Sequence, residues 1–291
     1  MRRILCTTVL VCLAAATARG QRPSTVEFRD TLGSFEFRDS RGDPSRPVKV
    51  WYYRPAGAAP PSRIVFLLHG STRTGQQAQA LGAPFARAQR AILLAPEFSL
   101  TDYPESSYDF GGVIDSTGRI RADSLWTLRL IEHLFDAARQ ASGAADSSYD
   151  IVGHSAGGQF VHRLVLFVPE ARFRRAVVSS PGRYAFPSAG VQFPYGLRGS
   201  PADTATLRRA FQRDVLLLLG DKDVADQARA WEPETAAQGR NRFARGLHFF
   251  ASAAEEAFAL GTPLAWRLRI AEGVDHDPPR MVRAALDLLK N

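Results

Sequence analysis

The sequence predicts a single α/β domain with a mostly parallel central sheet and helices on both faces. Short, continuous apolar runs recur along the chain, which is typical of strands that are buried on both faces of a parallel sheet. Segments of helical length separate these runs, and two antiparallel entry strands precede them. About 270 mature residues can bury one large core, which favours one domain over two small ones.

Each element can be assigned from its residue pattern. The two entry strands are expected at residues 25–38 and 48–54, where apolar and polar side chains alternate. Apolar runs predict six further strands, at residues 64–68, 91–95, 150–152, 175–178, 215–219 and 266–270. Helices are expected between or after them, at residues 76–90, 123–142, 158–167, 241–260 and 279–289.

The first 20 residues have the composition of a secretory signal peptide. Arg2 and Arg3 precede an apolar stretch that is too short to span a membrane, and small residues follow it. We therefore expect cleavage after Ala18 or Gly20, followed by one domain at residues 21–291. The protein is expected to be secreted, to the periplasm or the medium, without stable membrane insertion.

Both cysteines, Cys6 and Cys12, lie inside the predicted signal peptide. The mature chain is therefore expected to have no disulfide, no thiol nucleophile and no thiolate metal site. The formal charge of +8 falls to about +5 when the three arginines of the signal are removed. The remaining arginines are dispersed, which is typical of a solvated surface and argues against a nucleic acid partner.

Residues 149–164 have the pattern of a nucleophile elbow. A β-branched run ends at Gly153, Ser155 lies on a turn, and a helical pattern follows Gly157, which gives Gly-x-Ser-x-Gly between a strand and a helix. The serine of such a turn has a strained backbone, and a side chain at either glycine would collide with the neighbouring strand or helix. The pattern predicts an exposed, reactive Ser155.

The other polar candidates follow later and earlier strands. In a doubly wound sheet, reactive groups lie at the carboxyl ends of the strands. There the sequence has Ser71 after residues 64–68, Asp223 after residues 215–219 and His276 after residues 266–270. The order serine, aspartate, histidine is the one used by α/β-hydrolases, unlike chymotrypsin-like or subtilisin-like enzymes.

These residue types supply the parts of an acyl-transfer site. His276 is the expected base that takes the proton of Ser155, and Asp223 is expected to hold the imidazole in one tautomer. The backbone N–H groups of Ser71 and Ala156 are the expected oxyanion hole, where each donor contributes about 2.7 to 4 kcal/mol. Ala156 also begins a helix, whose dipole favours an anion.

Other residues compete for some of these roles. Asp221 and Asp226 lie near Asp223, although Asp221 is better placed to cap the turn. Histidines within helical patterns or beside the turns are interpreted as packing or surface residues: His69, His133, His154, His162 and His248. Asp275 and Asp277 flank His276, but adjacent carboxylates in a turn are mostly solvated, so we expect no metal site.

With these residues placed, the chain resembles the α/β-hydrolase superfamily over nearly all of its mature length. More narrowly, it resembles exported bacterial esterases of the polyhydroxybutyrate depolymerase and feruloyl esterase type. The resemblance rests on residues 68–71 (LHGS), 95–98 (APEF), 153–160 (GHSAGGQF), 219–223 (LGDKD) and 273–276 (GVDH). It implies the α/β-hydrolase fold and a serine esterase that uses no cofactor.

The sequence departs from that group in ways that favour small soluble esters over an insoluble polymer. Members commonly have a cysteine where this chain has Ser71, and secreted depolymerases often have disulfides and an added substrate-binding domain. Aromatic residues in two segments, 180–184 and 193–197, either line an acyl pocket or cover the sheet edge. Tyr103, Tyr108 and Phe110 precede a glycine pair in a long loop of the kind that is often functional.

The sequence thus predicts a secreted serine hydrolase that cleaves carboxylic esters, small or oligomeric, through an acyl-enzyme. Cleavage of polyesters or peptides, or acyl transfer to another acceptor, would use the same triad. A catalytically silent binding module is a third class, for which a broken triad would be the distinguishing feature. The oligomeric state is not predicted.

Overall fold

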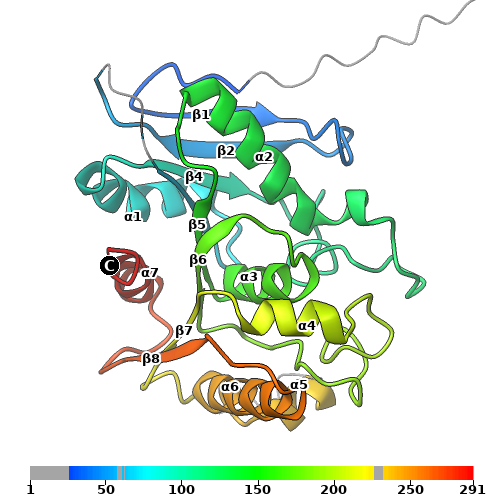
Figure 1. Cartoon of the computed structure of the whole chain (residues 1–291). Coiled ribbons are helices and arrows are strands. Elements are labelled where there is room, and N and C mark those ends of the chain that lie inside the picture. The colour runs from blue at the N-terminus through cyan, green and yellow to red at the C-terminus, as the bar shows by residue number, and fades with distance from the viewer. Residues whose placement is uncertain (1–25, 58–60, 62, 226–231, 291) are drawn as a thin grey trace, which may run out of the picture.

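The central feature of the fold is an eight-stranded sheet with the strand order β1-β2-β4-β3-β5-β6-β7-β8 (Figure 1). The computed structural model describes residues 26–57, 61, 63–225 and 232–290. β1 and β2 are antiparallel, β2 also runs antiparallel to β4, and the pairs from β4 to β8 are parallel. The strands are β1 (Leu32–Phe37), β2 (Val48–Tyr53), β3 (Ile64–Leu68), β4 (Ile92–Glu97), β5 (Tyr149–His154), β6 (Phe173–Ser179), β7 (Val215–Gly220) and β8 (Arg267–Ala271).

Helices cover both faces of this sheet. α1 and α7 pack together on one face, whereas α2, α3, α4 and α6 lie on the other, with α5 beside α6 (Figure 1). The helices are α1 (Gly75–Ala88), α2 (Thr127–Ser142), α3 (Ala156–Phe167), α4 (Thr204–Phe211), α5 (Pro233–Gln238), α6 (Arg242–Ala259) and α7 (Pro278–Asp287). The predicted fold class is confirmed.

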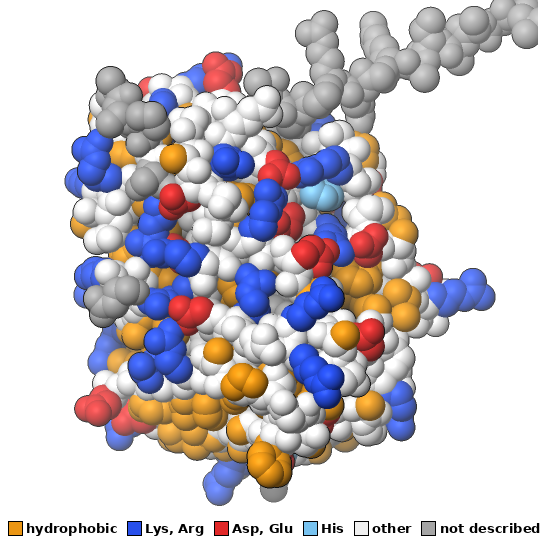
Figure 2. Space-filling view, viewed as in Figure 1, with side chains coloured by type: hydrophobic (Ala, Val, Ile, Leu, Met, Phe, Trp, Pro, Cys, Tyr) orange, Lys and Arg blue, Asp and Glu red, His pale blue; other side chains and the backbone are white. Residues whose placement is uncertain are grey.

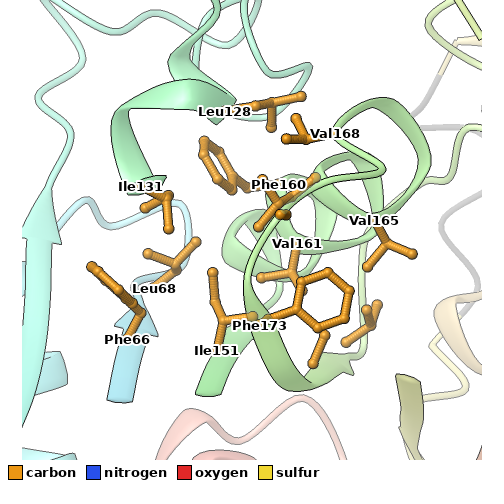
Figure 3. Packing of buried hydrophobic residues seen from close by; sticks show 14 of the residues in the cluster. Phe66, Leu68, Leu128, Ile131, Ile151, Phe160, Val161, Val165, Val168 and Phe173 are labelled. Carbon is orange, nitrogen blue, oxygen red and sulfur yellow. The ribbon is translucent and has the colours of Figure 1, made fainter. Parts of the chain in front are cut away.

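Successive side chains of the central strands enter two separate apolar clusters. On β3, Phe66 and Leu68 belong to the cluster beneath α3, while Val65 and Leu67 belong to the cluster beneath α1 and α7. Figure 3 shows Phe66, Leu68 and Ile151 facing the helix that carries Phe160. Because β3 is buried on both faces, its sequence is a continuous apolar run, and each large side chain there contributes about 1.5 to 3 kcal/mol.

The elements differ from the sequence-based expectations in three places. The first strand is confined to Leu32–Phe37, shorter than residues 25–38. The helix expected at residues 123–142 is divided into a 3₁₀ turn, η1 (Asp123–Leu125), and α2, because Trp126 is extended with ψ of 135°. The short helices α4 and α5 were not predicted.

Three features of the chain relate to export and partners: its first 20 residues, its helices and its surface charges. Residues 1–20, where the signal peptide and both cysteines are predicted, lie outside the described residues. Among the residues that are described, no helix is long and apolar enough to cross a membrane. Basic and acidic side chains are interspersed on the face shown in Figure 2, so the arginines form no continuous stripe there.

Candidate active site

Ser155 lies on a sharp turn between β5 and α3. Its φ of 57° and ψ of −116° are values that residues other than glycine rarely adopt. A Cβ atom at Gly157 would lie 2.5 Å from the carbonyl oxygen of Leu68, and one at Gly153 would overlap the carbonyl of Gly157. Close backbone contacts therefore require both glycines: Gly157 lies against strand β3, and Gly153 lies against helix α3.

His276 lies between Ser155 and Asp223. Its Nε2 is 3.0 Å from the Ser155 hydroxyl oxygen, and its Nδ1 is 2.8 Å from Oδ2 of Asp223. Because a carboxylate only accepts, Nδ1 carries the proton and donates to Asp223, which leaves the Nε2 lone pair for the serine proton. The structure thus brings together three residues that are far apart in the sequence, at the carboxyl ends of β5, β7 and β8.

Asp223 is buried but is held in its ionised form. Burial raises its pKa. The hydrogen bond from His276 and the nearby charge of Arg242 lower the pKa by a larger amount, so the pKa is below its usual value. Arg242 Nη1 is 3.5 Å from Oδ1, and α6 is fixed there because Phe243 N donates to the Asp223 carbonyl and Asn241 caps the helix. No sequence motif indicated Arg242.

Asp221 has a different role from Asp223. Its Oδ1 accepts a 2.7 Å hydrogen bond from the N–H of Gly273, and Lys222 N donates to the carbonyl of Val274. These bonds join the loop after β7 to the loop that carries His276. The expectation that Asp221 caps a turn agrees with this geometry, and Asp226 lies outside the described residues.

Ser71 and Ala156 belong to two different elements beside Ser155. Ala156 is the first residue of α3, so its N–H has no partner within the helix. Ser71 follows Gly70, where an added Cβ atom would lie 3.6 Å from Cβ of Ser155, so this loop passes close to the serine. Within the described chain, neither N–H donates to a backbone carbonyl.

A cavity of about 270 Å³ opens beside Ser155 and His276. It extends from the loop around Ser71 to the space between α1 and α7, where Ala78, Leu81 and Val282 form its apolar wall. Gln77, Thr72 and Thr74 add uncharged polar groups, and among the residues that the structure describes the lining contains no Asp, Glu, Lys or Arg. The volume lies just below the range of about 300 to 1,000 Å³ typical of ligand pockets.

Two solved structures are similar to this chain in both fold and sequence. Poly(aspartic acid) hydrolase-1 from Sphingomonas sp. KT-1 is 35% identical, with a TM-score of 0.86 over 91% of this chain and 100% of its own. LpqC, a poly(3-hydroxybutyrate) depolymerase from Bordetella parapertussis, is 31% identical, with a TM-score of 0.85 over 89% of each chain.

The chain belongs to the α/β-hydrolase superfamily. The siderophore hydrolase EstB from Aspergillus nidulans shares the fold at 14% identity, with a TM-score of 0.56 over 92% of this chain and 95% of its own. No protein-family model and no curated protein sequence matches the chain. The likeness to the two bacterial hydrolases identifies this protein as a hydrolase of the α/β-hydrolase type.

The other histidines of this α/β-hydrolase form their hydrogen bonds with groups other than Ser155 and Asp223. His133 Nδ1 is 2.7 Å from Asp39, and His248 Nδ1 is 2.9 Å from the Gln238 carbonyl. His69, His154 and His162 are buried. In the described part of the chain, no group of three or more His, Cys, Asp or Glu side chains is placed to hold a metal ion.

Tyr184 and Phe193 of the insert before β7 are packed in the core, and they do not line the cavity beside Ser155. Tyr184 is fully buried and stacks on Phe249, with ring centroids 4.5 Å apart. Phe193 packs edge to face against Phe167. Of the two interpretations left open by the sequence, these contacts favour coverage of the core. Tyr108 of the long loop is also buried.

Proposed function

We propose that this protein is a serine hydrolase that cleaves small, uncharged carboxylic esters. Ser155 is the nucleophile, His276 the general base and acid, and Asp223 the residue that orients His276. The observation that carries the proposal is the continuous hydrogen-bonded series from Ser155 through His276 to Asp223, which ends at an open cavity. Ser71 and Ala156 supply the oxyanion hole through their N–H groups.

The reaction follows from these positions. His276 Nε2 takes the hydroxyl proton while Ser155 Oγ attacks the ester carbonyl, and the carbonyl oxygen becomes an anion that faces the two N–H groups. The protonated His276 then gives its proton to the departing alkoxide, which leaves as an alcohol and produces the acyl-enzyme. Water, deprotonated by His276, attacks the acyl carbon; the bond from that carbon to Ser155 Oγ then breaks, His276 returns its proton to Oγ, and the acid is released.

The cavity supports the substrate class. The described lining has no Asp, Glu, Lys or Arg side chain and so offers no partner for a carboxylate, whereas its apolar wall fits an aliphatic group. One similar protein is named as a hydrolase of poly(aspartic acid), a polyanion, so the substrate of this chain is expected to differ from that one.

Polyester cleavage is the second candidate function, because LpqC is named as a poly(3-hydroxybutyrate) depolymerase at 31% identity. Product analysis with soluble oligoesters and suspended polymer separates the two. Peptide cleavage and acyl transfer to another acceptor use the same triad and are separated by acceptor competition. A catalytically silent binding module would not be labelled by any serine-directed probe.

The proposal of export rests on the sequence of the first 20 residues, and N-terminal sequencing of the secreted protein tests it.

Purified mature protein tests the proposal directly. It should hydrolyse short p-nitrophenyl esters and be labelled at Ser155 by a fluorophosphonate, and Ser155→Ala should abolish both reactions without changing the melting temperature. Well-folded protein that shows neither labelling nor turnover of any ester in a broad panel would contradict it.

A further inference from the structure

A buried carboxylate joins the two halves of the proposed oxyanion hole. Oδ1 of Asp109 accepts a 2.9 Å hydrogen bond from Arg73 Nη2, and Oδ2 accepts a 3.0 Å bond from Gln159 Nε2. Arg73 lies two positions after Ser71, and Gln159 lies three positions after Ala156. All three bonded side chains are buried, with residue exposures of 6% for Asp109, 9% for Arg73 and 4% for Gln159.

On one side, Arg73 fixes the loop that contains Ser71. Its backbone has a positive φ of 57°, and its N–H donates to the carbonyl of Gly70. Its guanidinium also donates to the carbonyls of Phe98 and Tyr103, at 3.3 and 2.9 Å. A strained residue persists only where surrounding contacts hold it, and here those contacts come from the loop after β4.

The same loop forms two hydrogen bonds with His69, the residue that begins the turn to Ser71. The N–H of Phe98 donates to Nε2 of His69 at 3.0 Å, and the hydroxyl of Tyr108 donates to the His69 carbonyl at 2.7 Å. The guanidinium of Arg73 lies 4.4 Å from the centroid of the Tyr108 ring. The long aromatic loop after β4 therefore holds the turn after β3 in place.

On the other side, Gln159 belongs to the first turn of the nucleophile helix. Its N–H donates to the Ser155 carbonyl at 3.0 Å. Arg163, one turn further along α3, donates from Nη1 to the carbonyls of Asp109 and Gln159, at 3.1 and 3.0 Å. Asp109 is thus tied to α3 through both its side chain and its backbone.

We propose that Asp109 is a positioning residue that sets the separation of the Ser71 and Ala156 N–H groups. This inference rests on the proposed function, since it assigns those groups to the oxyanion hole. Oxyanion donors are effective because they are aligned before the reaction begins, and a displacement of about 1 Å can reduce the rate about 100-fold. A carboxylate with two fixed donors on opposite elements holds such an alignment.

Burial of this ion pair is better explained by geometry than by stability. Burial raises the pKa of Asp109, against the charge of Arg73, which lowers it. Buried ion pairs are often no more stabilising than well-packed apolar residues of similar volume. Retaining the pair beside the nucleophile helix therefore points to a need for defined orientation.

Two variants test the proposal, with a third as a matched control. Gln159→Met removes the side-chain link from Asp109 to α3 but leaves the bond from Arg163 to the Asp109 carbonyl and the bond between Asp109 and Arg73, whereas Asp109→Asn weakens both side-chain links. The control, Asp150→Asn, also alters a fully buried carboxylate, which pairs with Arg63 and Arg174 near the opposite end of β5 from Ser155.

We expect both test variants to lower kcat about 10- to 100-fold with KM changed less than about twofold, because a misaligned oxyanion hole affects the transition state more than substrate binding. The rate at which a fluorophosphonate labels Ser155 should fall by a similar factor, since its phosphoryl oxygen occupies the oxyanion position. Asp150→Asn should lower the melting temperature but keep kcat and the labelling rate.

Unchanged kcat and labelling in Gln159→Met would overturn the proposal, as would an equal loss in Asp150→Asn. If Asp109→Asn does not fold, Gln159→Met alone decides. The labelling rate also separates this inference from the proposed function: wild-type protein that is labelled but cleaves no ester contradicts the ester substrate, while the comparison of labelling rates still tests Asp109.

Discussion

The ring of His154 lies against the ring of His276, with centroids 4.7 Å apart and planes inclined by 35°. His154 is buried, its Nδ1 is 3.2 Å from the Ser179 hydroxyl, and its Nε2 has no hydrogen-bond partner in the described structure. Burial, followed by the charge of His276, lowers the pKa of His154 to about 3. His154 therefore stays neutral while His276 gains and loses a proton, and it supports that ring by contact alone.

Replacement of His154 should show whether this contact matters. His154→Phe preserves an aromatic ring against His276, so we expect kcat/KM close to that of the wild type. His154→Ala leaves a space beside His276, and we expect kcat/KM to fall roughly 10-fold because the base is less well oriented. Steady-state kinetics with a p-nitrophenyl ester provide the measurement. Equal activity of the two variants would show that the contact has no role.

The two aspartates after β7 should respond differently to the same substitution. Asp223→Asn has a single side-chain oxygen, which Arg242 favours at the Oδ1 position, so its NH2 group faces His276 Nδ1 and selects the wrong tautomer; we expect kcat to fall by about 10⁴. Asp221→Asn keeps an oxygen for the N–H of Gly273, so we expect kcat within about twofold and a small loss of stability. The comparison uses kcat and the melting temperature of both variants, and a large loss of kcat in Asp221→Asn would contradict the assignment.

The three residues of the proposed triad, which the structure places in one hydrogen-bonded series, could be chosen from the sequence because each follows a strand with a clear apolar pattern. Ser155, Asp223 and His276 could be aligned by one rule, that reactive groups gather at the carboxyl ends of parallel strands. The glycines of the elbow were also readable, since their requirement is local to the backbone.

Asp109 and Arg242 were not predicted, because their importance depends on contacts rather than on sequence pattern. Asp109 lies in an irregular loop, and its partners Arg73 and Gln159 come from distant segments. Composition also could not show whether Tyr184 lines a cavity or fills the core, since an aromatic side chain suits both places.

Short helices were missed for a related reason. α4 and α5 are eight and six residues long, which is too short for an apolar period to stand out. α4 is defined by its cap, because the Asp203 side chain accepts from the N–H of Thr206, while α5 begins with Pro233 at its first position.

The apolar end of the cavity should control the chain length of the ester. Ala78→Leu adds bulk to the wall formed by α1, so we expect kcat/KM for hexanoate or hexyl esters to fall at least about 10-fold relative to acetate esters. Ala80→Leu makes the same change at an exposed position of α1 that does not line this cavity, and should leave the profile unchanged.

Two ester series, one varied in the acid and one in the alcohol, show which part of the substrate occupies the cavity. A p-nitrophenyl ester with a terminal carboxylate should be a poor substrate in either case, because no Lys or Arg of the described chain lines the cavity. A chain-length profile that is the same in the wild type and in Ala78→Leu would exclude the cavity as the determinant.

Two buried histidines should make the fold sensitive to mild acid. Nε2 of His69 accepts a hydrogen bond from the N–H of Phe98, and Nε2 of His162 accepts one from the N–H of Ala185 at 2.9 Å. Protonation of either Nε2 would break this bond, because the new N–H would face the backbone N–H. Burial lowers the pKa of His69 to about 4 and that of His162 well below its usual value. An unfolded histidine has a pKa of about 6.5, so the unfolded chain binds more protons below that pH.

The stability that depends on these neutral histidines is complete above about pH 6.5 and is lost as the pH falls toward 4. Each contributes a slope of up to about 1.4 kcal/mol per pH unit in that window. Urea unfolding at pH 7, 6 and 5 measures this slope. His162→Gln retains an acceptor for the N–H of Ala185 and leaves the carboxylates unchanged. We expect it to lower the slope by up to about 1.4 kcal/mol per pH unit, the contribution of one proton. A slope that is identical in wild type and variant would mean that His162 titrates normally in the folded protein.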